Sequence, residues 1–138
     1  MPELEQVLEK HPKEVKLVYK NFPLRNHKFS MQAAIAALAA EKQGKFWEFH
    51  DLLFKDYNRL NEETINEIAQ KLNLNMEKFE KDRKDPQIVA MINRDIDEGN
   101  QAGVRGTPTV FINGRLLRNR SVAGFDELID KALKTVAK

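Results

Sequence analysis

The apolar residues of this chain change their spacing twice, and that change limits the folds the chain can adopt. Within residues 15–20, Val15, Leu17 and Tyr19 alternate with Lys16 and Lys20, which is the period of a half-buried β-strand with Val18 as the exception. From about 28–103 the apolar residues recur every three or four positions, as in amphipathic helices. The pattern returns to β in residues 108–112. This order predicts an α/β fold in a single domain, residues 1–138.

Capping signals divide the helical block into separate helices. Asn75 is suited to cap a short helix, and Asp85 followed by Pro86 is typical of the start of another. Amphipathic helices are also expected at both ends of the chain, up to Pro12 and from Phe125 onward. The apolar positions expected to face the core of the helical block are Ala33, Ala34, Ala37, Leu38, Phe46, Phe49, Leu53, Ile65, Ile68, Ala69, Leu72, Ile88, Ile92 and Ile96.

The second β segment contains a hairpin signal. Asn113 and Gly114 are the preferred pair for a two-residue hairpin turn, so residues 108–112 are expected to return through residues 115–118. Residues 108–112 are apolar at nearly every position. A strand of that kind is expected to be covered on both faces.

Composition excludes several functional classes. The 138 residues include no cysteine, which excludes disulfide scaffolds, thiolate metal sites and cysteine nucleophiles in this chain. With 23 basic and 21 acidic residues the net charge is only +2, so nucleic acid is not an expected partner. The longest apolar run, residues 33–40, is too short to span a membrane, and no signal peptide is present. As written, the chain is expected to be cytoplasmic and not bound to a membrane.

The histidines do not have the spacing of metal ligands. His11, His27 and His50 are far apart, and none has a second ligand three or four residues away. We therefore expect no metal site and no cofactor.

Four arginines gather around the predicted hairpin. Arginines in such a place commonly protect an edge strand from pairing with other chains, and they also suit an acidic partner or a phosphate backbone. The nearly neutral net charge favours edge protection. The four are Arg105, Arg115, Arg118 and Arg120.

The segment Gly-Val-Arg-Gly-Thr-Pro-Thr-Val-Phe-Ile-Asn-Gly at residues 103–114 closely resembles the proline loop of DsbA-like thioredoxin-fold disulfide oxidoreductases. Residues 14–24 and 44–54 fit the same family, as does the helical block at about 28–103. The resemblance implies a thioredoxin-like (DsbA-like) fold with a helical insertion. In that family a first β-strand leads into a Cys-x-x-Cys motif, and the resemblance implies that both are missing here, as in an N-terminally truncated chain.

The resemblance also implies a substrate-binding loop at Gly106, Thr107 and Pro108. In the family the bond before this proline is cis, and the backbone of the preceding residue pairs with an extended peptide. A cis X–Pro bond costs only about 0.5–1 kcal/mol. Because the thiolate is the nucleophile of thiol–disulfide exchange, no catalytic residue is expected, and the chain is expected to be inactive as an oxidoreductase.

Two alternatives to this reading are open. One is a non-catalytic module that binds extended peptides or proteins through the loop. The other is a relative of glutathione-dependent transferases or isomerases, which place a catalytic serine in the segment that is missing here. Proteins of the resembled family are mostly periplasmic or exported, so the native compartment is open as well.

The missing strand has a consequence for assembly. In the family it lies between the partners of residues 15–20 and 108–112, so both segments lose a neighbour. The chain is expected either to pair these segments directly or to form a homodimer, possibly swapped, and the homodimer is favoured.

Overall fold

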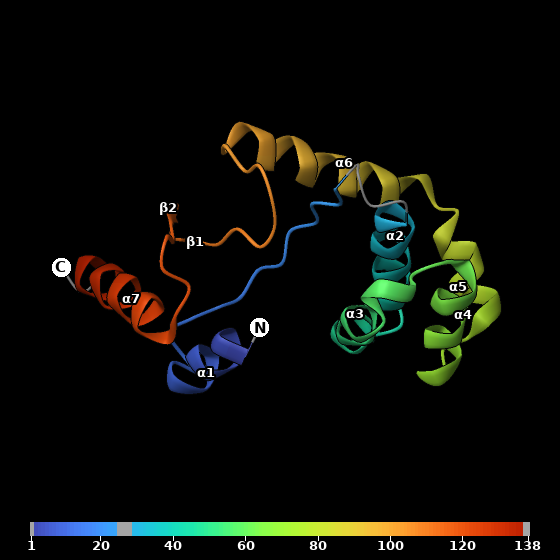
Figure 1. Cartoon of the computed structure of the whole chain (residues 1–138), viewed down its shortest axis with the longest axis horizontal. Helices are drawn as coiled ribbons and strands as arrows, with labels where there is room; N and C mark the ends of the chain where they lie inside the picture. Colours follow the sequence, from blue (N-terminus) through green and yellow to red (C-terminus); the bar gives the residue numbers. More distant parts are fainter. Residues whose placement is uncertain (1, 25–28, 137–138) are drawn as a thin grey trace. The chain divides into compact units, whose positions relative to one another are not determined.

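The structure is a computed structural model that describes residues 2–24 and 29–136. The chain divides into two compact units, and each is described by itself. The terminal unit is built from both ends of the sequence, Met1–Tyr19 and Gly106–Lys138, and the helical unit is Lys20–Arg105 (Figure 1).

The helical unit covers the helical insertion predicted at about 28–103, and a single domain over the whole chain stays a prediction. Three of its helices begin at a side chain that accepts a hydrogen bond from a backbone N–H of the first turn: Asn61, Asn75 and Asp85. Such caps satisfy donors that have no partner within the helix. The elements are α2 (Ser30–Glu41), α3 (Phe46–Lys55), the 3-10 helix η1 (Tyr57–Arg59), α4 (Glu62–Lys71), α5 (Met76–Arg83) and α6 (Pro86–Gln101).

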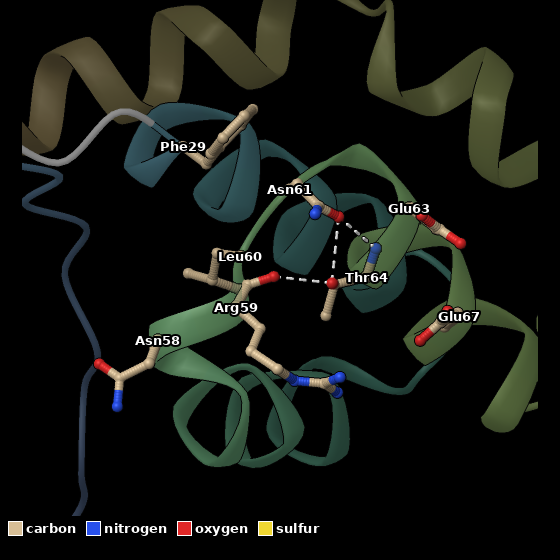
Figure 2. Close-up of a pocket in the computed structure, with 8 residues that line it drawn as sticks. All are labelled: Phe29, Asn58, Arg59, Leu60, Asn61, Glu63, Thr64 and Glu67. Carbon is tan, nitrogen blue, oxygen red and sulfur yellow. Dashed lines mark hydrogen bonds between the residues drawn. The ribbon is translucent and has the colours of Figure 1, made fainter.

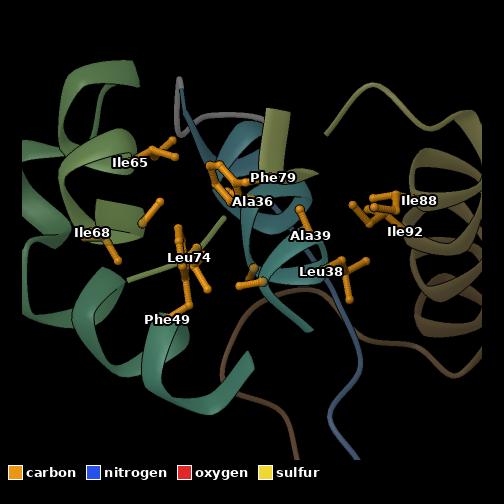
Figure 3. Close-up of a cluster of buried hydrophobic side chains, with 13 residues drawn as sticks. Ala36, Leu38, Ala39, Phe49, Ile65, Ile68, Leu74, Phe79, Ile88 and Ile92 are labelled. Atoms are coloured by element: carbon orange, nitrogen blue, oxygen red, sulfur yellow. The ribbon is translucent and has the colours of Figure 1, made fainter. Parts of the chain in front are cut away.

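Helix α2 is the centre of this unit and contacts α3, α4, α5 and α6. Its positions 36–40 are all buried, whereas the sequence pattern predicted only a narrow buried face. A helix that is apolar all round is packed on several sides, and its alanines allow close approach. Figure 3 shows α2 between Ile65 and Ile68 of α4 and Ile88 and Ile92 of α6.

Two aromatic rings fill the space between α3 and α5. Phe49 and Phe79 are both fully buried, and their ring centroids lie 5.8 Å apart. Aromatic side chains of this size bury large apolar areas. The predicted helical core is therefore confirmed, with these two rings among its largest members.

The two ends of the helical unit are held side by side by a buried polar contact. The backbone N–H and the side-chain amide of Asn21 both donate to Asp95 Oδ2 at 2.9 Å. Lys20 Nζ lies 3.3 Å from Glu98 Oε2. A methyl group on Gly99 would lie 2.8 Å from the ring of Phe22, so this glycine allows the chain to pass close to α6.

The terminal unit has a small core. Helix α1 packs on α7, and α7 also contacts β1. Among the described residues, the buried apolar side chains of this core are Val7, Leu117, Phe125 and Ile129. The elements are α1 (Pro2–Lys10), β1 (Phe111–Ile112), β2 (Arg115–Leu116) and α7 (Val122–Val136).

The predicted hairpin is confirmed. Asn113 and Gly114 have φ angles of 48° and 82°, the left-handed values that a tight two-residue turn requires. Strands β1 and β2 are antiparallel, with Phe111 opposite Leu116. The N–H of Leu117 donates to Val110 O at 2.8 Å, so the ladder continues one residue beyond the assigned strands.

Other β predictions are wrong. Residues 15–20 form no strand: Val15 and Leu17 are half-buried, but Tyr19, which alternation places on the same face, is 42% exposed. Alternation reports which faces of a segment are apolar, but a strand also needs a partner for its backbone. Among the described residues β1 pairs with β2 and with nothing else, so residues 15–20 and 108–112 do not close on each other.

The predicted strand at 108–112 is also shorter than expected, and its return is limited to β2 rather than residues 115–118. The expected cover on both faces is absent within the described part, since Phe111 is 40% exposed. A two-stranded ribbon has no further strand or helix on its outer face. The apolar pattern therefore correctly predicted a strand in this segment, but the predicted burial of both its faces was wrong.

Candidate functional site

The three predicted site residues form one loop that leads into β1. The peptide bond between Thr107 and Pro108 is cis, the isomer that the resemblance implies. Thr107 and Pro108 are exposed, and Gly106 is half-buried. Two hydrogen bonds hold the loop: Thr109 Oγ1 donates to Gly106 O, and Arg120 Nη1 donates to Pro108 O, both at 2.7 Å.

The backbone of Thr107 is open. Within residues 2–24 and 29–136, neither its N–H nor its C=O takes part in a hydrogen bond. Backbone groups normally pair or face water, and an exposed, unpaired N–H and C=O on one residue can accept an added extended strand. The loop can therefore pair with a peptide at this residue.

Arg120 at this loop was not predicted from the sequence, which placed it only in a general arginine cluster. The hairpin register explains its position. Each step back from Ile112 along β1 is matched by a step forward from Arg115 along β2. The last backbone bond of this ladder within the described residues is at Leu117, and counting on at the same spacing leads from Leu117 toward Arg120 and from Val110 toward Thr107. Counting residues outward from the Asn113–Gly114 turn could therefore have indicated from the sequence that Arg120 lies near the loop.

The other arginines of the cluster are exposed. Within the described part of the chain, no ion pair joins Arg105, Arg115, Arg118 or Arg120 to a carboxylate. Asp126, the next carboxylate along the chain after Arg120, pairs with Lys10 instead: its Oδ2 is 2.6 Å from Lys10 Nζ, and this hydrogen bond lowers the pKa of Asp126. The hairpin end of the terminal unit thus carries positive charge without an internal counterpart.

A pocket of about 430 Å³ opens in the helical unit beside the start of α4 (Figure 2). Its central polar groups serve the helix cap. Asn61 Oδ1 accepts hydrogen bonds from Thr64 N–H and Thr64 Oγ1, whose hydroxyl also lies 2.7 Å from Arg59 O. Because these groups are already bonded to one another, the pocket is explained by helix capping.

His11 and His50 are the histidines that lie within the described residues. Within the described residues no group of three or more metal-ligating side chains occurs. His50 packs among aromatic rings, with the Phe54 centroid 4.6 Å away. His11 Nε2 lies 3.7 Å from Asp126 Oδ1, and His27 lies outside the described residues. No described helix is long and apolar enough to cross a membrane.

Comparison with known proteins places the chain in a family. A family model with the description Thioredoxin matches residues 2–131, almost the whole sequence. The chain belongs to the thioredoxin family. This thioredoxin-family chain also matches the crystal structure of a thioredoxin-like oxidoreductase from Silicibacter pomeroyi with a TM-score of 0.84 and 29% identity. The match covers 97% of this chain and 77% of the other, and it confirms the thioredoxin-like fold.

Curated relatives are longer than this thioredoxin-family chain. It is 30% identical over 128 residues to the probable disulfide bond formation protein D of Bacillus anthracis, covering 87% of this chain and 58% of that protein. It is also 37% identical over 102 residues to the Na(+)/H(+) antiporter NhaA 3 of Salinispora tropica, covering 73% of this chain and 16% of the antiporter. The chain therefore spans about a sixth of that antiporter and under two thirds of the Bacillus protein.

Proposed function

We propose that this chain is a thioredoxin-family module that binds extended peptides at Gly106, Thr107 and Pro108 and does not itself exchange thiols and disulfides. The observation that carries the proposal is the exposed Thr107 backbone, whose N–H and C=O have no partner within the described residues. The relationship to thioredoxin-like oxidoreductases supports a role in handling polypeptides. The absence of cysteine is consistent with binding without chemistry.

The purified chain is expected to reduce insulin disulfides no faster than buffer does. Exchange requires a thiolate that attacks a disulfide sulfur, and none of the 138 residues is cysteine. The measurement is insulin turbidity in the presence of dithiothreitol, with a thiol-containing thioredoxin as the positive control. A catalysed rate in a thiol-free preparation would contradict this part of the proposal.

Peptide binding is expected to depend on the Thr107 backbone and not on its side chain. Thr107→Ala keeps the N–H and should bind a labelled unstructured peptide with nearly unchanged affinity. Thr107→Pro removes the N–H and should weaken binding by about tenfold or more, since one pairing hydrogen bond is lost. Fluorescence anisotropy measures both affinities.

A second set of peptides controls for the possibility that Thr107→Pro weakens binding by distorting the loop. Methylating single backbone nitrogens of the peptide removes its pairing donors while the protein stays unchanged. Methylation of the nitrogen that pairs with Thr107 should strongly weaken binding to the natural chain. Methylation of the neighbouring nitrogen, whose N–H points away from the loop, should not. Equal affinities for all methylated peptides would argue against strand-like pairing.

We further propose that the chain forms a homodimer, possibly swapped, through the terminal unit. Residues 16–18 are extended and make no backbone hydrogen bond within the described part of the chain. Val18, Phe111 and Leu116 are 60%, 40% and 46% exposed. An extended segment with unpaired backbone and exposed apolar side chains is a template for pairing with another chain.

Light scattering at micromolar concentration should give twice the 16.0 kDa chain mass. Val18→Lys, which places a charge on the unpaired segment, should shift the dimer toward monomer. Val89→Lys is the matched control, because Val89 is an exposed valine on α6 of the helical unit. A monodisperse 16.0 kDa species for the unmodified chain would reject the dimer.

A further inference from the structure

Arg120 is fixed beside the open backbone of the loop. Its Nη1 donates to Pro108 O at 2.7 Å, so the guanidinium lies at the residue that directly follows Thr107. The side chain is nevertheless exposed. A guanidinium has five N–H donors in a planar fork, and this bond uses one of them, so the others can reach a ligand that lies along the loop.

The charge of Arg120 has no counterpart in the described part of the chain. No carboxylate lies within ion-pair distance of it, nor of Arg115 and Arg118, the two other arginines on this side of the hairpin. Edge protection explains Arg115, which lies in β2. It does not explain Arg120, which lies beyond the strand and bonds to the loop instead.

We infer that the loop selects acidic peptides, with Arg120 binding a carboxylate of an extended ligand that pairs with Thr107. This rests on the proposed peptide binding and names the ligand class. An arginine fork matches a carboxylate in geometry, and charge-assisted hydrogen bonds of this kind are stronger than neutral ones. Side chains of an extended peptide alternate in direction, so one Asp or Glu near the paired residue reaches Arg120 without disturbing the backbone pairing.

The test uses the full chain and two labelled peptides of the same length, one with glutamate at alternate positions and one with glutamine there. The glutamate peptide should bind about tenfold more tightly at low salt. The preference should shrink at about 0.15 M salt, because exposed charges are screened.

Three variants isolate the guanidinium. Arg120→Gln removes the charge and shortens the side chain, so it should remove the preference: the glutamate peptide should lose about tenfold more affinity than the glutamine peptide does. Arg120→Lys keeps the charge but loses the fork, so it should retain only part of the preference. Arg94→Gln is the matched control: Arg94 is an exposed arginine of α6, without an ion pair within the described residues, and its loss should change neither affinity.

Each other outcome overturns the inference in a distinguishable way. Equal affinity of the natural chain for both peptides rejects acidic selection while peptide binding stands. An equal loss for both peptides in Arg120→Gln means that Arg120 only holds the loop. No binding of either peptide overturns the proposed function together with the inference. Binding of an oligonucleotide in preference to the glutamate peptide would show that the charge serves phosphate instead.

Discussion

Phe79→Ala is expected to lower the free energy of unfolding of the helical unit by about 3–5 kcal/mol. Phe79 is fully buried, its ring packs against Phe49 at 5.8 Å, and the guanidinium carbon of Arg83 lies 5.4 Å from the ring centroid. The substitution removes apolar surface that folding buries away from water, and it leaves a cavity that the closely packed neighbours do not fill. Urea denaturation followed by helical circular dichroism measures the loss.

Phe54→Ala is the matched control for this prediction. It deletes the same atoms from a phenylalanine that is 64% exposed, so the expected loss is under about 1 kcal/mol. Similar losses for the two variants would mean that Phe79 is not part of a packed core.

Gly124→Ala is expected to destabilise the terminal unit by about 1–3 kcal/mol. Helix propensity alone predicts the opposite sign, since alanine within a helix is favoured over glycine by roughly 0.5–1 kcal/mol. In the structure, however, a Cβ on Gly124 would clash with the backbone oxygen of Asn119. The steric cost exceeds the propensity gain because a backbone atom cannot move aside as a side chain can.

Gly99→Ala provides the comparison. There the added methyl would lie 2.8 Å from the Phe22 ring, which is a side chain that can rotate. A smaller loss of stability than in Gly124→Ala is therefore expected when both variants are melted side by side. A more stable Gly124→Ala protein would contradict the close approach of Asn119 to α7.

Helix starts could be predicted from the sequence because capping is local. Asn75 and Asp85 each accept a hydrogen bond from a backbone N–H two or three residues further on, so the pattern and the contact lie in the same short segment. The hairpin turn at Asn113 and Gly114 is equally local. The loop at Thr107 could be located for a related reason, since its residues are consecutive.

Features that depend on distant partners could not be predicted in this way. The strand expected at 15–20 needs a neighbouring strand that no local pattern supplies, and among the described residues no strand pairs with this segment. The contact between Arg120 and Pro108 spans twelve residues and follows only when the turn is extended into a register. Burial of α2 on several sides depends on four other helices.

The contacts of Asn21 with Asp95 and of Lys20 with Glu98 bear on the order in which the chain can fold. The terminal unit is discontinuous, so its second half emerges from the ribosome only after the whole helical unit has been made. Once that unit is folded, these contacts hold its first residues against the C-terminal half of α6. Part of the entropy of closing the long intervening segment has then already been lost, so the two halves of the terminal unit are joined by a shorter effective loop. Breaking the Asn21–Asp95 contact would therefore slow assembly of the terminal unit without touching any residue within it.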